Sequence, residues 1–261
     1  MSQRDPPRSD QAALEPRVLH EAGGVVAIDK PAGLPTQAPA GIDSVESWLR
    51  GRLAAESGSD GGYVGVPHRL DRAVSGVILM AVTPRAARKL SRQFEQREIR
   101  KTYLALLAVD DASTAEFPAE WRDVLEKVPD QPRARIVPRE TEGGREAITH
   151  ARQLAGAAGW LLAELEPLTG RMHQLRVQSA SRGMPVLGDA LYGGETDAVA
   201  TRATFGPAVA DPRSRPIALH AWRIRYVDPE TASAVSVESP PPAFWPEEAR
   251  AVAAAPPAGG S

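Results

Sequence analysis

A single aspartate lies between two arginines in the stretch that joins two apolar runs. Asp71, flanked by Arg69 and Arg72, follows residues 63–66 and precedes residues 77–82. Continuous apolar runs are typical of buried strands, so we expect the carboxylate on a short connection held by a rigid scaffold. The neighbouring positive charges favour its ionised form, which can act as a nucleophile, a base or an electrostatic stabiliser. A structural salt bridge at a turn would use the same residues.

The composition bounds the class of protein. Hydrophobic residues make up 42% of the 261 residues, which is ordinary for a globular protein with a sizeable core. No apolar run reaches the roughly 18 residues of a membrane-spanning helix, and the polar N-terminus lacks a signal-peptide core. The chain has no Cys, and its five His are scattered. We therefore expect a cytoplasmic protein with no disulfide, no metal site and no membrane contact.

The apolar and turn patterns predict a strand-rich chain with three helices. Expected strands cover 18–20, 25–28, 63–66, 77–82, 101–107, 134–138 and 219–226, with a hairpin of 147–154 and 160–165 across 156–159. Expected helices cover 45–53, 84–97 and 172–182. Asp43 or Ser44 can cap the first, and the second starts at Thr83 as cap and Pro84. Residues 110–146 are otherwise expected to be irregular. One domain over 17–248 would lie between disordered tails at 1–16 and 249–261.

Positive charge is concentrated near the central aspartate, although the net charge of the chain is −2. Residues 69–101 hold nine Lys or Arg against three acidic residues. This excess can form a basic patch for nucleic acid, and it can equally be a solvated helix face. Four arginines are candidates for phosphate contacts, with plain solvent exposure as the alternative: Arg72, Arg85, Arg88 and Arg92.

Residues 68–76, His-Arg-Leu-Asp-Arg-Ala-Val-Ser-Gly, resemble the central motif of the RluA-type pseudouridine synthases, His-Arg-Leu-Asp-x-x-Thr-Ser-Gly. Further matches follow in the family's order at 29–33 (Lys-Pro-x-Gly), 101–106 (Lys-x-Tyr-x-Ala-Leu), 170–176 (Gly-Arg-x-His-Gln-Leu-Arg), 183–193 (Gly-x-Pro-x-x-Gly-Asp-x-x-Tyr-Gly) and 219–221 (Leu-His-Ala). Three positions depart from the family pattern: Asp29 replaces Asn, Val74 replaces Thr, and Gln178 replaces His.

This resemblance implies the isomerisation of uridine within RNA. The N1–C1′ bond breaks and C5 rejoins C1′, with no cofactor or metal required. Asp71 would be the essential carboxylate, either attacking C1′ or removing the 2′ proton, with Arg176 as its partner. Tyr103 would stack on the base, with the C5 proton as a further possible task. The remaining substrate-binding residues implied are Arg69, which would fill the space vacated by the base, Leu175, which would form an apolar wall, and His68, Arg72 and Arg171.

The same resemblance implies an α+β fold with a mixed, mostly antiparallel sheet, peripheral helices and a central active-site cleft. The expected partner is ribosomal or transfer RNA, with ribosomal RNA preferred, and we expect a monomer. Two other classes of function stay open at this point. One is a catalytically silent RNA-binding protein. The other is a glycosidase or nucleoside hydrolase, which would need a second carboxylate such as Glu166 close to Asp71.

Overall fold

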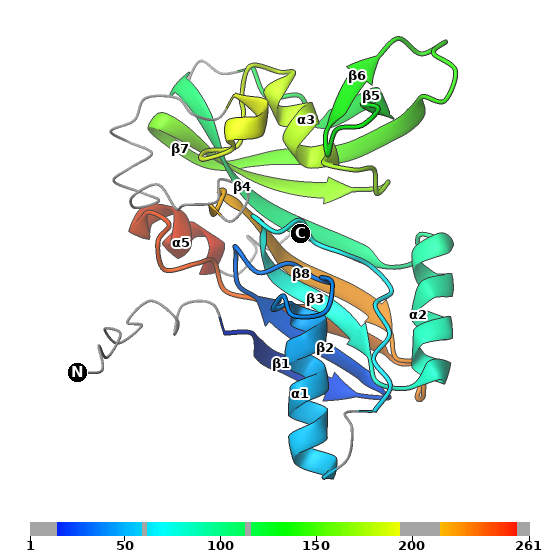
Figure 1. The fold of residues 1–261 in the computed structure, drawn as a ribbon. Helices are drawn as coiled ribbons and strands as arrows, with labels where there is room; N and C mark the ends of the chain where they lie inside the picture. The colour runs from blue at the N-terminus through cyan, green and yellow to red at the C-terminus, as the bar shows by residue number, and fades with distance from the viewer. Residues whose placement is uncertain (1–14, 59–61, 113–115, 194–214, 255–261) are drawn as a thin grey trace, which may run out of the picture.

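A nine-stranded sheet organises the chain in the computed structural model, which describes residues 15–58, 62–112, 116–193 and 215–254. The strand order is β1–β2–β3–β8–β4–β7–β5–β6, with β9 paired to β8. Among the described pairs only β3 and β8 run parallel, so the sheet is mixed and mostly antiparallel, as expected. Figure 1 shows β5, β6 and α3 at one end of the molecule and β1, β2 and α1 at the other.

The strands are β1 (Arg17–Ala22), β2 (Val25–Lys30), β3 (Ser75–Ala81), β4 (Arg100–Asp111), β5 (Glu120–Lys127), β6 (Ala134–Val137), β7 (Arg145–Pro167), β8 (Leu219–Val227) and β9 (Ala234–Glu238). The helices are α1 (Val45–Ser57), α2 (Pro84–Glu95), α3 (Gln174–Ala180), the 3₁₀ turn η2 (Ala190–Tyr192) and α5 (Glu247–Ala254).

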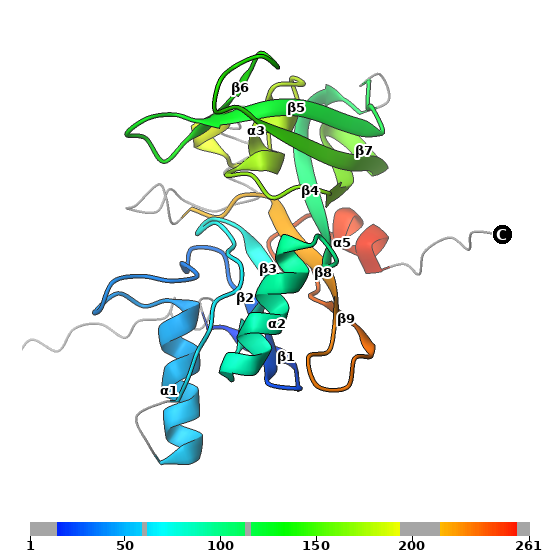
Figure 2. The same cartoon turned by 90° about the vertical axis from the view of Figure 1, so that its right-hand side faces the viewer.

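Helices cover both faces of the sheet where β2 and β3 pair. Successive strand residues point to opposite faces, so a strand that is covered on both sides is apolar throughout. One face packs Val26, Ile28, Ile78 and Met80 with Val45 and Leu49 of α1. The other face packs Val25, Ala27, Val77 and Leu79 with Ala86 and Leu90 of α2. Figure 2 looks onto α2 in front of the sheet. The apolar run that begins at Val77 is therefore a fully buried strand as far as Ala81, and only Val82 of the predicted strand lies outside it.

The two long helices begin where the sequence indicates. Ser44 caps α1, and its hydroxyl accepts a hydrogen bond from the amide of Ser47, whose side chain in turn bonds the Ser44 amide. Thr83 caps α2 by accepting from the amide of Ala86, with Pro84 in the first turn. These bonds satisfy amides that have no partner within the helix. Both caps confirm predicted helix starts.

β7 folds back on itself as the predicted hairpin. The amide of Leu168 donates to the carbonyl of Ile148 at 2.9 Å, and Arg152 pairs with Glu164 at 2.9 Å, so the two arms lie side by side. Gly159, near the turn, has a φ of 87°, which glycine adopts without strain. The first arm pairs with β5 and the second with β4. β7 thereby joins β5 and β6 to β4 within one sheet.

Four predictions about the fold were wrong. Residues 63–66 form only one bridge, between Gly65 and Ala81, because the Leu79 amide of β3 donates to the His68 side chain and not to a backbone carbonyl. β5 occupies part of the stretch that was expected to be irregular, and β9 was not predicted at all. The helix expected over 172–182 is limited to α3, because His173 has a left-handed φ of 52°.

The C-terminal boundary was also wrong. α5 continues to Ala254, into the segment that was expected to be disordered from residue 249. Ala249 and Ala253 are one helical turn apart and both are buried against the main core, which explains why an alanine-rich end is ordered. The remainder of the two predicted tails, 1–14 and 255–261, lies outside the described residues.

Candidate active site

The loop that carries Asp71 is fastened to the segment that follows β2. The Thr36 hydroxyl donates to the carbonyl of Leu70 at 2.9 Å and accepts from the amide of Leu70 at 3.1 Å. The amide of Gly33 donates to the carbonyl of Arg72 at 2.7 Å, and the Arg72 side chain returns a bond to the Gly33 carbonyl at 2.8 Å. The loop before β3 is therefore held on both sides of Asp71. This is the rigid connection that the sequence predicted.

Lys30 also holds the Asp71 loop in place. Its side chain is fully buried, and its ammonium donates to the carbonyls of Pro31, Leu34 and Arg72 at 2.9, 2.7 and 3.2 Å. Burial lowers the pKa of Lys30 to about 7, with Asp71 acting to raise it and Arg72 to lower it further. A buried amine with three carbonyl partners fixes the distance between the Lys-Pro-x-Gly loop and the Asp71 loop.

Asp71 shares one arginine with a second carboxylate. Arg176, on α3, donates from Nη1 to Oδ2 of Asp71 at 3.0 Å, and from Nε and Nη2 to Asp189 at 2.6 and 2.8 Å. Burial acts to lower the pKa of Arg176, but the bonds and charges of Asp189 and Asp71 outweigh it and the pKa is raised. Asp189 has a side chain that is 1% exposed, whereas that of Asp71 is 35% exposed. Only Asp71 is therefore open to a substrate.

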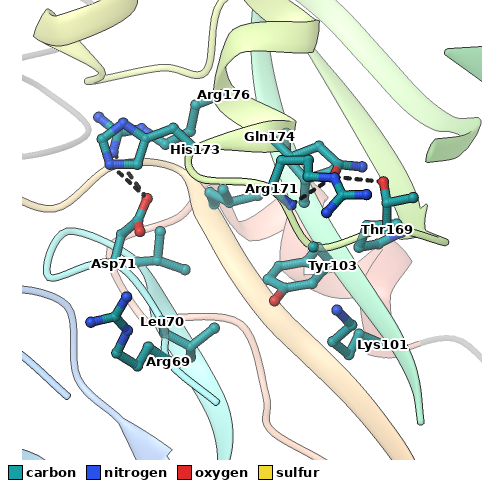
Figure 3. Close-up of a pocket in the computed structure, with 15 residues that line it drawn as sticks. Arg69, Leu70, Asp71, Lys101, Tyr103, Thr169, Arg171, His173, Gln174 and Arg176 are labelled. Atoms are coloured by element: carbon teal, nitrogen blue, oxygen red, sulfur yellow. Dashed lines mark hydrogen bonds and ion pairs between the residues drawn. The ribbon is translucent and has the colours of Figure 1, made fainter. Parts of the chain in front are cut away.

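A cavity of about 150 Å³ opens beside Asp71 and continues into a groove of about 920 Å³. Figure 3 shows Asp71 and Tyr103 on opposite sides of this cavity. Leu175 lines it together with Leu70 and Val74, which gives the cavity an apolar wall. Burial, followed by the charge of Asp71, raises the pKa of Tyr103. The structure thus brings together Asp71, Tyr103, Leu175 and Arg176, as the resemblance implied.

Cationic side chains surround the cavity. Arg69 is exposed and lines both cavity and groove, and no carboxylate partner is recorded for it among the described residues. Arg171 also lines both, and it donates to the carbonyl of Glu146 at 2.9 Å. Lys101 also lines both and was not assigned a role from the sequence. Burial lowers the pKa of Lys101, and burial together with Arg145 and Arg97 lowers the pKa of Arg171. The cavity mouth is suited to an anionic ligand.

His68 and Arg72 line the groove but have structural partners. Nε2 of His68 accepts a hydrogen bond from the amide of Leu79 at 2.9 Å, and its ring lies 4.5 Å from that of Phe94. Burial lowers the pKa of His68 to about 3, with Lys101 acting in the same direction. His68 is therefore neutral and tied to β3, while Arg72 is tied to Gly33. Their predicted contact with substrate stays a prediction.

The other phosphate candidates lie away from the cavity. Arg85, Arg88 and Arg92 are exposed on α2, and none of them lines the cavity or the groove. The acidic partner of Arg176, Asp189, was missed by the sequence reasoning. Its signal is the Gly-Asp-x-x-Tyr-Gly motif, which was matched to the family without a role for its aspartate.

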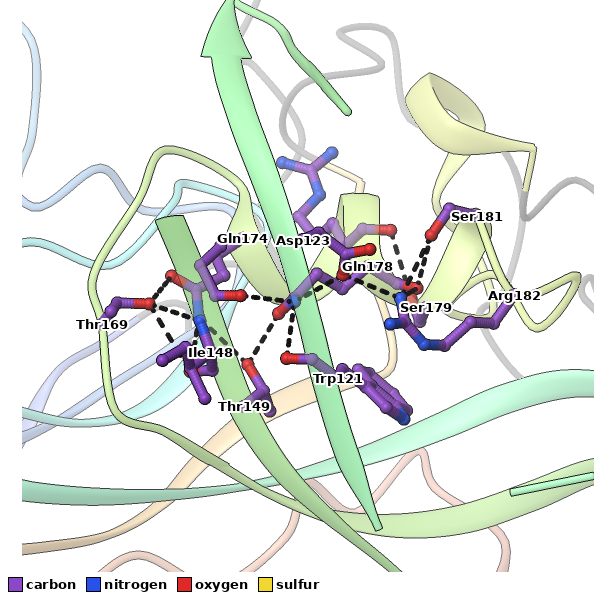
Figure 4. Close-up of polar contacts among 12 residues, drawn as sticks. Trp121, Asp123, Ile148, Thr149, Thr169, Gln174, Gln178, Ser179, Ser181 and Arg182 are labelled. Atoms are coloured by element: carbon purple, nitrogen blue, oxygen red, sulfur yellow. Dashed lines mark hydrogen bonds and ion pairs between the residues drawn. The ribbon is translucent and has the colours of Figure 1, made fainter. Parts of the chain in front are cut away.

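α3 is positioned by a buried network of neutral side chains, shown in Figure 4. Oε1 of Gln174 accepts from Thr169 at 2.8 Å, and Oε1 of Gln178 accepts from Thr149 at 2.7 Å. The amide of Gln174 also donates to Thr149 at 3.0 Å, which joins the two pairs. Gln178 further donates to Asp123 at 2.8 Å and to two backbone carbonyls. The glutamine that departs from the family pattern is fully bonded here.

Two features are absent from the part of the chain that the structure describes. No group of three or more His, Cys, Asp or Glu side chains within 15–58, 62–112, 116–193 and 215–254 is arranged to hold a metal ion. Among the helices of the same ranges, none is long and apolar enough to cross a membrane.

Comparison with known proteins identifies the family. Residues 24–181, more than half of the chain, match the family model described as RNA pseudouridylate synthase. The chain is 35% identical over 196 residues to the dual-specificity RNA pseudouridine synthase RluA of Yersinia pestis, covering 71% of this chain and 86% of that protein. It is 31% identical over 242 residues to the tRNA pseudouridine synthase C of Salmonella typhi, covering 85% and 84%.

The fold agrees with that identification. The solved structure of human RNA pseudouridylate synthase domain containing 4 superposes with a TM-score of 0.68 at 23% sequence identity, covering 87% of this chain and 89% of that one. With the matching family model and relatives, this places the chain among the RluA-type RNA pseudouridine synthases, to which it belongs.

Proposed function

We propose that this isomerase acts through Asp71, with Arg176 as its partner, on a uridine held in the cavity between Asp71 and Tyr103. The observation that carries the proposal is the Asp71–Arg176–Asp189 arrangement. Arg176 is held in place by two bonds from the buried Asp189, so its remaining Nη1 is aimed at Asp71. Preorganised donors of this kind need no rearrangement when charge develops during a reaction.

Tyr103 is suited to stacking on the base. A phenol must lose its proton to act as a base, and this cavity works against that loss because burial and the charge of Asp71 raise the pKa of Tyr103. Its ring, opposite Asp71, can form the floor for a uracil, with Leu175 as the wall. Arg69, which is exposed at the cavity mouth, would fill the space that the base leaves in the RNA.

The hydrolase alternative has no second acid to support it. Asp71 is the one carboxylate among the described residues that line the cavity. Glu166 follows Leu165, which pairs with Tyr103 in the sheet, so Glu166 points to the opposite face from Tyr103. There it accepts a bond from Thr102 at 3.4 Å. A catalytically silent RNA-binding protein would not need an ionised Asp71 held by Arg176 at the cavity.

The target is proposed from the relatives. A relative in Xanthomonas campestris, 31% identical over 86% of this chain and 66% of its own length, is named ribosomal large subunit pseudouridine synthase D. Others are named for transfer RNA or for dual specificity. We propose ribosomal RNA as the target and the cytoplasm as the compartment. We propose a monomer because a single chain supplies Asp71, Tyr103 and Arg176 to one cavity.

Pseudouridine mapping of total RNA tests the proposal. A strain that lacks the gene is complemented with the wild type or with Asp71→Asn, and every uridine is compared. The proposal requires that at least one site loses its modification and that only the wild type restores it. Restoration by Asp71→Asn would refute the role of Asp71, and release of free uracil by the purified protein would favour the hydrolase. The class of RNA that changes decides between ribosomal and transfer RNA.

A further inference from the structure

His173 has an unusual backbone conformation directly beside Asp71. Its φ is 52°, in the left-handed region, and it precedes α3 without a capping bond from its own side chain. Residues other than glycine are uncommon there, although Asn, Asp and His tolerate it better than most. The conformation directs the imidazole to the cavity, where His173 is one of the lining residues (Figure 3). Such local strain persists where surrounding contacts fix it.

The hydroxyl of Tyr192 lies against one ring nitrogen of His173. The amide of Ala134 in β6 donates to the Tyr192 hydroxyl at 2.9 Å, and the same hydroxyl lies 2.9 Å from Nδ1 of His173. An amide can only donate, so the hydroxyl oxygen accepts there and has its own proton left to give. Nδ1 is its one recorded acceptor among the described residues. This arrangement favours a bond from Tyr192 to Nδ1, with the proton of the neutral imidazole on Nε2.

Two pKa shifts agree with this arrangement. Burial raises the pKa of Tyr192, so the phenol keeps the proton that it donates. Burial also lowers the pKa of His173, against the charge of Asp71 and with that of Arg176, so the imidazole is neutral. The ring of Tyr192 is held as well, because the Arg176 guanidinium lies over it, 5.2 Å from its centroid.

The protonated nitrogen faces the carboxylate of Asp71. Nε2 of His173 lies 3.6 Å from Oδ2, the same oxygen that accepts from Arg176 at 3.0 Å. A separation of 3.6 Å is longer than a hydrogen bond, and contacts of this kind shorten when a substrate closes the site. The other oxygen of Asp71, Oδ1, has no hydrogen-bond partner recorded among the described residues. The two donors therefore leave one carboxylate oxygen free.

We propose that His173 is a positioning residue for Asp71: its Nε2–H tautomer, set by Tyr192, holds Oδ2 together with Arg176 and presents Oδ1 to the ribose. The inference rests on the proposed function and deepens it. If Oδ1 attacks C1′, a C–O bond forms and the N1–C1′ pair leaves with the uracil. If Oδ1 takes the 2′ proton, the C2′–H pair forms the C1′–C2′ double bond as the uracil leaves. His173 gives up no proton in either step.

The tautomer can be measured without any RNA. In ¹⁵N-histidine-labelled protein, long-range ¹H–¹⁵N correlation spectra distinguish a protonated ring nitrogen from an unprotonated one. The His173 signals are identified by their loss in His173→Asn. The expected result is a proton on Nε2 in the wild type and a mixture of tautomers in Tyr192→Phe. A proton on Nδ1 in the wild type would overturn the inference.

Two replacements of His173 separate positioning from shape. Gln places its amide nitrogen near the position of Nε2 and keeps a donor toward Asp71, whereas Asn is too short to reach it. Asn, however, suits the left-handed backbone better than Gln. The positioning role therefore predicts that His173→Asn loses kcat by roughly 10- to 100-fold, as when a group that orients a functional side chain is removed. It predicts a smaller loss in His173→Gln, with KM nearly unchanged in both.

A merely structural role predicts the reverse order, with His173→Asn the more active and the more stable variant. Thermal melting of both variants checks that they fold, and the substrate is a transcript that contains the uridine identified by mapping. The outcomes also separate the two proposals. A wild type that makes no pseudouridine refutes the function whatever the tautomer, and a wild type that is active with the wrong tautomer refutes only the role of His173.

Discussion

The two sides of α3 are both polar and both buried, yet they are built from different chemistry. Toward the cavity, Arg176 joins Asp71 and Asp189 in a charged cluster. Toward β5 and β7, Gln174 and Gln178 join Thr149 and Thr169 in a network of amides and hydroxyls, which reaches the edge of the cavity at Gln174 and Thr169. Gln174 and Gln178 are four residues apart and therefore share a helix face, which Arg176 does not. One short helix thus carries a charged face and a neutral face.

The difference shows where charge is used. Neutral amides and hydroxyls lose little when they leave water, provided that every donor and acceptor finds a partner. Burying a charge costs several kcal/mol of desolvation free energy, and only a well-oriented partner of opposite charge offsets that cost. The chain positions α3 with amides and hydroxyls, whose one charged partner, Asp123, is half-buried and paired with Arg182. The more deeply buried charges, Arg176 and Asp189, lie on the side that faces the substrate. Four predictions test this division of roles, from the largest expected effect to the smallest.

Breaking the charged cluster has the largest effect. Arg176→Met leaves the buried Asp189 without its cationic partner, which we expect to cost about 3–5 kcal/mol of unfolding free energy. Adding Asp189→Asn removes that charge and is expected to restore most of the stability, with activity still absent. Urea unfolding and the modification assay measure the two quantities. A double variant as unstable as the single one would show that charge is not the cause.

Breaking the neutral network should affect stability alone. Gln178→Leu removes the bonds to Thr149 and Asp123, with an expected cost of about 2 kcal/mol. Gln178→His, the family's usual residue, keeps one donor and one acceptor and should cost less. The measurement is the free energy of unfolding beside kcat per folded molecule. A loss of kcat greater than about tenfold in a fully folded Gln178→Leu would contradict the division of roles.

Acid should lower the stability of the groove wall through His68. Its folded pKa of about 3 lies below the value of 6.5 for an unperturbed His, so between these pH values the unfolded chain binds the extra proton. Stability therefore falls as the pH falls from about 6.5 toward 3, by about 1 kcal/mol per pH unit for this group. His68→Gln can still accept from the Leu79 amide but does not titrate. An unchanged pH slope in that variant would contradict the assignment.

The smallest effect is expected at Val74, where the family has Thr. Val74 is 3% exposed, and its amide donates to the carbonyl of Asp71 at 3.1 Å. Val74→Thr keeps the shape but buries a hydroxyl, so we expect a loss of about 1 kcal/mol of unfolding free energy and kcat within about twofold of the wild type. Calorimetry and the modification assay are the measurements. A large gain in kcat would contradict this expectation, because it would show that a hydroxyl at position 74 improves the action of Asp71.

The sequence predicts the parts of the fold in which a local pattern and the packing agree. The continuous apolar run of β3 and the caps Ser44 and Thr83 were sufficient to locate a strand and two helices. β5 was missed because its buried residues, Trp121 and Leu125, are separated by charged or half-buried ones. Its strand character comes from pairing with β6 and β7, which no local pattern records.

The site divides in the same way. The resemblance correctly indicated that Asp71, Tyr103 and Arg176 come together, because each lies in a recognisable motif. It could not indicate that Asp189 fixes Arg176, or that Tyr192 orients His173. Those contacts depend on how the chain returns after α3, which sequence spacing does not determine. The structural contacts of His68 and Arg72 were missed for the same reason, because their backbone partners lie in other segments.

The position of β8 sets the order in which the enzyme can be assembled during synthesis. β8 follows β1 to β7 in the chain, yet it lies in the middle of the sheet, between β3 and β4. A nascent chain that has not reached residue 219 can pair β1 with β2 and β3, and separately β4 with β7, but nothing joins these halves through the sheet. Asp71 precedes the first half's inner strand and Tyr103 lies on the second. A chain that has not yet formed β8 therefore lacks the strand that joins the two parts of the sheet, and it lacks Leu219 from the lining of the cavity.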